Sequence, residues 1–187
     1  SVLDQTADKL SKSRLNVIDK ICKQVENSLK KLGIPHAQFN IEHQLLNEVQ
    51  ANGIDSFDFL FSANKGMPPQ KVAKTASGGE ISRLVLSVKA LLAEHQQLPT
   101  ILFDEIDTGV SGEIADQMGN LLSEISAKRQ VISITHLPQI AAKGQSHYFV
   151  YKSNDEERTK TQMRELSKEE RLSEIAKMLS GKNLTEA

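Results

Sequence analysis

The sequence predicts an α/β fold in which a mostly parallel sheet is flanked by helices and preceded by one long helix. Apolar strands at 100–105 and 131–135 enclose a helical pattern at 112–129, which is the arrangement of a βαβ unit. A long amphipathic pattern covers 3–32. In addition, 39% of the 187 residues are hydrophobic, which is enough for one domain with a real core.

The first segment repeats apolar residues every three, four or seven positions, which predicts a helix that Gly33 and Pro35 end. The repeating residues are Leu3, Ala7, Leu10, Val17, Ile21, Val25, Leu29 and Leu32. Because the stripe is close to a heptad and the early part of the helix is polar, the residues alone suit a packed surface helix and one arm of a two-stranded coiled coil equally well.

Two strands are predicted next, at 37–43 and 57–63, where aromatic and β-branched residues alternate or cluster. Turn-forming residues at 51–56 separate the strands, so we expect them to pair as a hairpin. A glycine and two prolines then predict a loop at 64–74.

The second half of the chain alternates helices and strands. The strongly apolar stretch 80–95 predicts a helix with only one narrow exposed face. After the βαβ unit come a short helix that begins at Pro138, two strands at 147–153 and 159–166 joined by a polar turn, and a final helix at 168–181.

Composition excludes several classes of protein. A net charge of −1, from 23 basic and 24 acidic residues, makes no general electrostatic case for wrapping nucleic acid or binding an anionic membrane. The single cysteine, Cys22, excludes an internal disulfide and a multi-cysteine zinc site. Since no apolar run approaches the length of a membrane span and no signal pattern is present, we expect a cytoplasmic protein without a membrane partner. The start at Ser1, inside a helical pattern, predicts a piece of a longer protein.

Acidic residues and a histidine follow two strands of the predicted sheet, where parallel α/β sheets bind their ligands. Asp104 and Glu105 close one strand, and His136 follows the other. An apolar strand that ends in Asp-Glu is the Walker B pattern, in which the aspartate holds Mg²⁺, usually through water, and the glutamate orients or deprotonates the attacking water. A histidine donor at this edge can reach a γ-phosphate.

The stretch SGGE, residues 77–80, precedes the helix at 80–95 and is typical of an anion site. An exposed helix N-terminus offers unpaired N–H groups and a partial positive charge, and glycine allows close approach. Each motif alone has an ordinary structural interpretation, as a helix cap or a solvated strand end. Their order is specific, however, because Asp104 follows Gly79 by 25 residues and His136 follows Glu105 by 31.

Three stretches of the chain resemble the ABC-type ATPases, and among them the SMC-like branch with coiled-coil arms that includes a bacterial DNA repair protein. These stretches are SANKGMPPQKVAKTASGGEISRL, LFDEIDTGVSGEIADQMG and ITHLPQIAAKGQSHYFV. The resemblance spans nearly the whole chain and implies the C-terminal lobe of an ABC/SMC-type ATPase head. Residues 1–33 would be the end of a coiled-coil arm helix, and residues 34–187 the C-terminal half of the head.

The resemblance also implies roles for single residues. Glu105 would be the catalytic base, His136 the switch histidine and Asp104 the Mg²⁺ carboxylate. The D-loop would contain Asp107, near the dimer interface, and Gly109. The ABC signature, which contacts the γ-phosphate of ATP held by an opposing head, would be formed by Ser77, Gly78, Gly79 and Glu80.

One motif of these ATPases is absent, because none of the ten glycines begins G-x-x-x-x-G-K-[ST]. Without a P-loop the nucleotide site is incomplete, so we expect the isolated fragment to be inactive. The resemblance implies that an N-terminal head half supplies the P-loop. The complete head would then form an ATP-dependent homodimer that hydrolyses ATP with Mg²⁺ and acts at the nucleoid in DNA double-strand break repair and recombination.

Two other functions remain open from the sequence. The chain could be a non-catalytic SMC-like head fragment that serves as a dimerisation or DNA-docking module. A transporter subunit of another ABC family is disfavoured by the stretch THLPQIAA and by the arm helix. For DNA itself, Lys65, Lys71 and Lys74 flank the signature loop and could contact phosphate, although lysines in a polar loop are usually only solvated.

Overall fold

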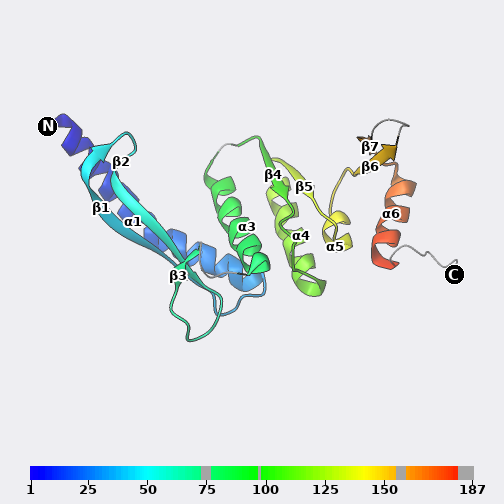
Figure 1. Ribbon diagram of the computed structural model, residues 1–187, viewed down its shortest axis with the longest axis horizontal. Coiled ribbons are helices and arrows are strands. Elements are labelled where there is room, and N and C mark those ends of the chain that lie inside the picture. Colours follow the sequence, from blue (N-terminus) through cyan, green and yellow to red (C-terminus); the bar gives the residue numbers. More distant parts are fainter. Residues whose placement is uncertain (73–76, 97, 155–158, 181–187) are drawn as a thin grey trace. The chain divides into compact units, whose positions relative to one another are not determined.

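A computed structural model of the chain describes residues 1–72, 77–96, 98–154 and 159–180. The fold divides into two compact units, Ser1–Leu98 and Pro99–Ala187, and contains the helices and strands expected of an α/β protein (Figure 1). No helix in these described ranges has both the length and the apolar character needed to cross a membrane.

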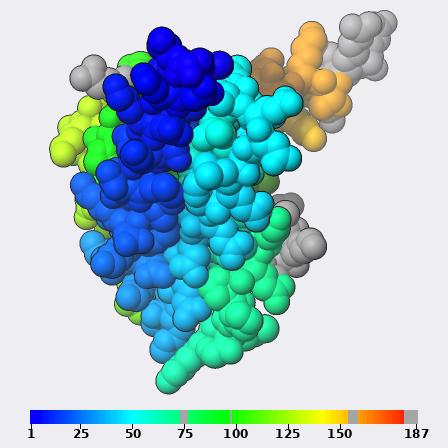
Figure 2. Space-filling view, turned by 90° about the vertical axis from the view of Figure 1, so that its left-hand side faces the viewer, coloured from blue at the N-terminus to red at the C-terminus, as the bar shows by residue number. Residues whose placement is uncertain are grey.

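The first unit packs a long helix against an antiparallel sheet. The elements of this unit are α1 (Val2–Lys31), β1 (Gln38–Gln50), β2 (Gly53–Ser62), β3 (Gln70–Lys71) and α3 (Gly78–His95). In Figure 2, α1 runs alongside the hairpin of β1 and β2, and the sheet order is β1-β2-β3. The long helix, the hairpin and the apolar helix predicted from sequence are therefore all present.

The core of this unit lies at the C-terminal part of α1. Val25 and Leu29 of α1 pack with Phe39 of β1, Phe61 of β2 and Leu84 of α3, and each of these side chains is buried. The first half of α1 instead leaves large apolar side chains exposed. These are Val2, Leu3, Leu10, Leu15 and Val17.

A buried carboxylate ties the first half of α1 to the hairpin. Asp55 of β2 accepts hydrogen bonds from Ser11 Oγ (2.6 Å) and Arg14 Nη1 (2.8 Å), and it lies 2.7 Å from His43 Nε2. The hydrogen bond from Ser11, together with those from Arg14 and His43, lowers the pKa of Asp55 from 3.8 to about 2. The carboxylate therefore remains charged inside the unit, where three partners satisfy it.

Two expectations for this region are wrong. The turn predicted at 51–56 is limited to residues 51 and 52, because β1 continues to Gln50 and β2 begins at Gly53. Asp55, a turn-former by propensity, is held inside the strand by side chains distant in the sequence. The loop predicted at 64–74 contains the short strand β3, which pairs with β2.

The second unit contains the predicted βαβ arrangement. The strands β4 (Thr100–Asp104) and β5 (Gln130–Ile134) are parallel neighbours, and α4 (Gly112–Ser126) connects them. A further hairpin of β6 and β7 is antiparallel. The remaining elements are α5 (Pro138–Ala141), β6 (Tyr148–Asn154), β7 (Thr159–Glu165) and α6 (Lys168–Ser180). Each predicted helix and strand of this half is confirmed, with bounds that differ by up to three residues; residues 155–158 of the predicted polar turn and residue 181 of the final helix lie outside the described residues.

The parallel strands are apolar on both faces but buried mainly on one. Ile101 and Phe103 of β4 are buried. On the opposite face the apolar side chains Leu102, Ile132 and Ile134 are about half exposed, at 51%, 46% and 51%. This is unusual for parallel strands, which are normally covered on both faces.

The helix α4 approaches α5 closely through a glycine. A side chain at Gly119 would place its Cβ 3.2 Å from the carbonyl oxygen of Gln139 and 3.0 Å from Lys143 Cγ. At the other end of α5, Arg171 of α6 donates hydrogen bonds to the carbonyl oxygens of Gly144 and Gln145. These contacts hold the segment that follows β5 between α4 and α6.

Candidate functional site

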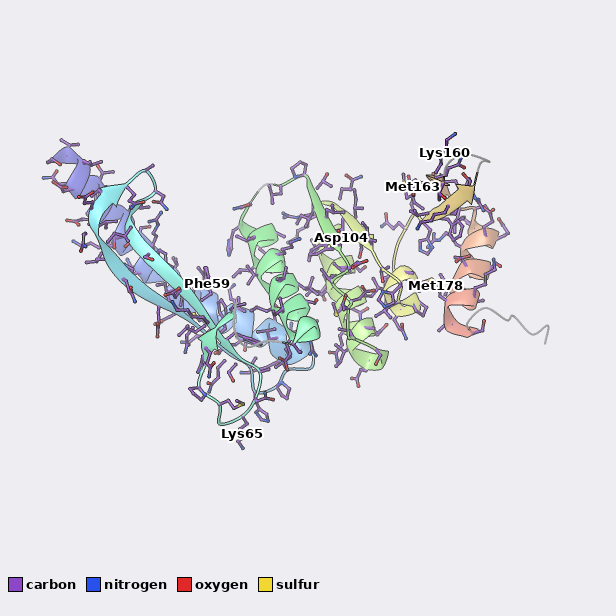
Figure 3. The ribbon with its side chains drawn as sticks, in the orientation of Figure 1. Phe59, Lys65, Asp104, Lys160, Met163 and Met178 are labelled. Carbon is purple, nitrogen blue, oxygen red and sulfur yellow. The ribbon has the colours of Figure 1, made fainter. Side chains whose placement is uncertain are left out.

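The acidic pair lies where the sequence predicts it, at the carboxyl end of β4. Asp104 is the last residue of β4 and is paired in register with Ile134, the last residue of β5 (Figure 3). The side chains of Asp104 and Glu105 are exposed. Since the strands are parallel, the residues that follow β5 emerge at the same edge, which brings His136 into the same region.

Glu105 has the only left-handed backbone conformation of a non-glycine residue in the described ranges, with φ 47°. Its N–H donates to the carbonyl oxygen of Ile134 (3.3 Å), and its own carbonyl oxygen accepts a hydrogen bond from Thr108 Oγ1 (3.0 Å). Such a conformation costs a residue with a Cβ about 1–2 kcal/mol, and strained residues of this kind cluster at active sites. The backbone strain at Glu105 therefore supports the hypothesis that this position has a function.

A buried aspartate joins the turn after β4 to the segment after β5. The side chain of Asp107 is fully buried, and its Oδ2 accepts hydrogen bonds from Thr135 Oγ1 and from the backbone N–H of His136 (3.3 Å). The ring of His136 is 69% exposed, with Nδ1 3.7 Å from the same oxygen. Sequence reasoning selected Asp107 and His136, but it missed Thr135.

The remainder of the predicted D-loop is a tight, exposed turn. Val110 donates to the carbonyl oxygen of Asp107 (3.2 Å), and Gly109 has φ 72°, which glycine adopts without strain. Thr108 and Gly109 are exposed, whereas Asp107 points inward. Thr108 is therefore the residue of this turn whose side chain is exposed, while its Oγ1 donates to the carbonyl oxygen of Glu105.

The signature stretch lies in the first unit and forms the N-terminus of α3. Ser77 is the N-cap, and its Oγ accepts from the backbone N–H of Glu80 (3.4 Å) while the Glu80 side chain accepts from the N–H of Ser77 (3.2 Å). A Cβ built on Gly78 would meet no atom of the described residues within 4 Å, so none of these residues blocks the approach to this helix end. The amides of Gly78 and Gly79 precede the first intrahelical hydrogen bonds and can face an anion.

An arginine that sequence reasoning did not select links this helix end to α1. Arg83 Nε donates to the carbonyl oxygen of Gly79 (3.0 Å), and Arg83 Nη1 donates to the carbonyl oxygen of Leu32, at the end of α1 (3.2 Å). An arginine inside an amphipathic helix carries no sequence signal for such a contact. The orientation of the signature residues is therefore fixed relative to the end of the long helix.

The lysines near the signature differ in their surroundings. Lys65 is exposed in the loop before β3 (Figure 3). Lys71 Nζ lies 2.8 Å from Asp58 Oδ2, and this hydrogen bond raises the pKa of Lys71. Lys74 lies outside the described residues. An ion-paired Lys71 is a weaker candidate for a DNA contact than the sequence suggests.

Asp104 fits a Mg²⁺ ion that is held largely by other oxygen ligands. Within the described ranges, no three histidine, cysteine, aspartate or glutamate side chains are grouped closely enough to hold a metal. Mg²⁺ commonly binds proteins through one or two carboxylates and completes its coordination with water and substrate phosphates. An exposed carboxylate at a strand end suits that mode, and it does not suit a metal site made entirely by the protein.

Comparison with known sequences finds relatives along almost the whole chain, although no protein-family model matches it. The chain is 38% identical over 185 residues to the DNA repair protein RecN of Haemophilus influenzae, covering 98% of this chain and 33% of that protein. It is 40% identical over 182 residues to RecN of Vibrio cholerae, covering 97% of this chain and 33% of that protein. The chain therefore spans about a third of the length of the curated relatives that it matches.

Solved structures show the same fold at low sequence identity. An Smc head domain with a coiled coil and joint from Pyrococcus yayanosii superposes with a TM-score of 0.66 and 18% identity, over 92% of this chain and 32% of that chain. A chain described under ATP-driven dimerization and DNA-stimulated activation of SMC ATPases gives a TM-score of 0.59 and 17% identity, over 92% of this chain and 99% of that chain. The chain thus has the fold of part of an SMC head.

Proposed function

Because this chain is a relative of the C-terminal part of the DNA repair protein RecN and has the fold of an SMC head lobe, we propose that it forms the C-terminal half of an SMC-like ATPase head. Joined to an N-terminal half with a P-loop, this head dimerises on ATP and hydrolyses it. The cycle serves DNA double-strand break repair and recombination, at the nucleoid in the cytoplasm.

The observation that carries this proposal is the convergence of the acidic pair and the histidine at one edge of the parallel sheet. Asp104 ends β4, the strained Glu105 follows it, and the exposed ring of His136 emerges beyond β5. The backbone of Glu105 is hydrogen-bonded to Ile134, so the two segments are held together at this edge. This is where open α/β sheets bind ligands.

The chemistry assigns each residue one task. Mg²⁺, when bound, would supply positive charge that neutralises the phosphates. Asp104 is the residue whose carboxylate would hold it. Glu105 accepts a proton from the attacking water or orients it, and its exposed carboxylate is free to do so. His136 donates a hydrogen bond to the γ-phosphate from its exposed ring.

The signature residues serve the site of a partner head. Ser77 Oγ accepts the capping bond, and its hydrogen, which has no acceptor among the described residues, can be donated to a phosphate oxygen. The open face of Gly78 lets the phosphate approach the helix N-terminus. The same helix end therefore contacts the γ-phosphate of ATP held by the second copy, which makes the dimer depend on ATP.

The half-exposed apolar face of β4 and β5 is evidence that another part of the head packs against it. Its apolar side chains, Leu102, Ile132 and Ile134, are of the kind that parallel strands normally bury. The sequence contains no P-loop, so the N-terminal head half has to meet the phosphates beside this sheet. We assign the face to that half.

The exposed apolar side chains on the first half of α1 are evidence that this helix belongs to a coiled-coil arm. Leu3, Leu10 and Val17 are spaced by seven residues and are exposed at 61%, 40% and 44%. An antiparallel helix of the same arm would cover this stripe. The second half of α1 is buried in the core of the first unit, where the arm enters the head.

The first test is ATP hydrolysis by the chain co-expressed with its N-terminal half. Glu105→Gln keeps the size of the side chain but removes the base, so kcat falls by about 100-fold or more, and an ATP-bound dimer accumulates on size exclusion. Glu113→Gln alters another exposed glutamate of the same unit and is the matched control, with unchanged turnover. Full turnover in Glu105→Gln would disprove the assignment of the base.

A second measurement tests whether the site is incomplete. Isothermal titration of Mg-ATP into the 187-residue chain alone should detect no tight binding, because the cradle for the α- and β-phosphates is missing. Tight binding would contradict the divided head. If the joined halves form an ATP-dependent dimer but the wild-type protein does not hydrolyse ATP, the chain is instead a non-catalytic dimerisation or DNA-docking module.

A further inference from the structure

The geometry points to Asp107 as a positioning residue that holds His136 in place for the γ-phosphate. This inference rests on the proposed ATPase function and adds a residue that acts through another. Asp107 is itself fully buried, so it does not contact the nucleotide. It acts through hydrogen bonds to the segment that carries His136.

The segment from Thr135 to Leu137 has no regular structure, since β5 ends at Ile134 and α5 begins at Pro138. Asp107 Oδ2 accepts from Thr135 Oγ1 and from the N–H of His136. Thr135 Oγ1 in turn accepts from the N–H of Leu137 (3.0 Å). The backbone is therefore held at His136 itself and at the residue on each side of it.

The orientation of the imidazole follows from the same oxygen. His136 Nδ1 lies 3.7 Å from Asp107 Oδ2, too far for a hydrogen bond but on the side that faces the buried carboxylate. Nε2, across the ring, consequently points away from Asp107. With 69% of the side chain exposed, this outward nitrogen is the one available to a phosphate.

Asp107 also connects the two catalytic segments. It lies two residues after Glu105, whose N–H bonds to the carbonyl oxygen of Ile134. The base and the histidine are thus tied to each other at two places, by the backbone at Ile134 and by the side chain of Asp107. A movement of one segment would displace the other.

The contacts of the two carboxylate oxygens suggest informative substitutions. All the hydrogen bonds go to Oδ2, while Oδ1 is buried without a hydrogen-bond partner among the described residues. Asp107→Asn can place its amide oxygen at the Oδ2 position and keep both bonds, whereas Asp107→Ala removes both. Thr135→Val removes only the hydroxyl. Ser133→Ala is the matched control, because the buried Ser133 Oγ, on β5 two residues before Thr135, has no hydrogen-bond partner among the described residues.

The expected effects are on the chemical step. In the full-length protein, Asp107→Ala should lower kcat for ATP by about 100-fold and change KM by less than about 3-fold, because misplacing a catalytic group by about 1 Å has such an effect. Thr135→Val should lower kcat by about 10-fold, because it removes the hydrogen bond to Asp107 and the one from the Leu137 N–H but leaves the bond from the His136 N–H to Asp107 in place. Asp107→Asn should restore turnover to within about 5-fold of wild type, and Ser133→Ala should leave it unchanged.

The decisive test repeats Asp107→Ala and Thr135→Val in a His136→Ala background. If Asp107 acts through His136, neither change lowers kcat by more than about 2-fold once the imidazole is gone. Equal losses in both backgrounds would overturn the inference. If Asp107→Ala fails to fold, the Thr135→Val cycle alone decides in the same way.

Hydrogen exchange of the nucleotide-free protein gives a readout independent of catalysis. The amides of 135–137 should exchange faster in Asp107→Ala and Thr135→Val than in wild type or Ser133→Ala, and unchanged exchange would overturn the inference. The proposed function fails separately, if wild type does not hydrolyse ATP or if Glu105→Gln retains full turnover.

Discussion

Replacing Glu105 by glycine should make the protein more stable while abolishing its activity. The backbone of Glu105 has φ 47°, in the left-handed region, where a residue with a Cβ carries about 1–2 kcal/mol of strain. Glycine removes this strain but gives the unfolded chain more freedom, which offsets about 0.4–1 kcal/mol. The net gain in the free energy of unfolding is therefore about 0–1.6 kcal/mol, with a midpoint of about 0.8 kcal/mol.

Glu105→Ala provides the matched comparison, because it also removes the carboxylate but keeps the Cβ and therefore the strain. Both variants should lose turnover equally, and Glu105→Gly should unfold at the higher urea concentration. A gain of about 1 kcal/mol corresponds to a rise in Tm of about 2–4 °C for a domain of this size. If Glu105→Gly is no more stable than Glu105→Ala, the left-handed conformation is not a source of strain and the argument fails.

Three further predictions concern the framework of the site. The pKa of Asp55 is lowered to about 2, so its contribution to the free energy of unfolding is complete above its ordinary pKa of 3.8 and is lost as the pH falls through 2. In Asp55→Asn, the free energy of unfolding should therefore depend less on pH between pH 4 and 2 than it does in wild type. Gly119→Ala should destabilise the protein by about 1 kcal/mol in urea unfolding, because the clash with the Gln139 carbonyl oxygen outweighs the better helix propensity of alanine; equal or greater stability would contradict the close approach. Leu29→Ala, at a fully buried position, should lower the free energy of unfolding by about 2–5 kcal/mol, and a loss below 1 kcal/mol would show that Leu29 is not part of the core.

The elements of the second unit were predictable because their patterns are local. The apolar runs of β4 and β5 and the 3.6-residue period of α4 depend only on neighbours within one element, and the parallel order follows from the helix between them. The positions of Asp104 and His136 at one edge follow from the same order. The sequence could thus predict that these residues lie at the same edge of the sheet, although it could not predict the hydrogen bonds around them.

The turn of the hairpin was predicted wrongly because the conformation of Asp55 depends on side chains that lie far from it in the sequence. Its partners Ser11 and Arg14 lie 44 and 41 residues earlier in the chain, on α1. Local propensity favours a turn at an Asn-Gly-Ile-Asp stretch, but a carboxylate satisfied by three side chains is stable within a strand. Arg83 was missed for a related reason, since its acceptor at Leu32 is 51 residues away.

The sequence by itself determined the type and order of the elements other than the short strand β3. It also determined the Asp-Glu pair after a strand, the histidine after the next strand and the absence of a P-loop, since each is a local pattern of residues. Only the tertiary structure decided that Asp107 is buried and holds the segment of His136, that Glu105 has a strained backbone, and that one face of β4 and β5 is half exposed. Burial, strain and hydrogen bonding between residues far apart in the chain depend on how the elements pack. No window of sequence contains that information.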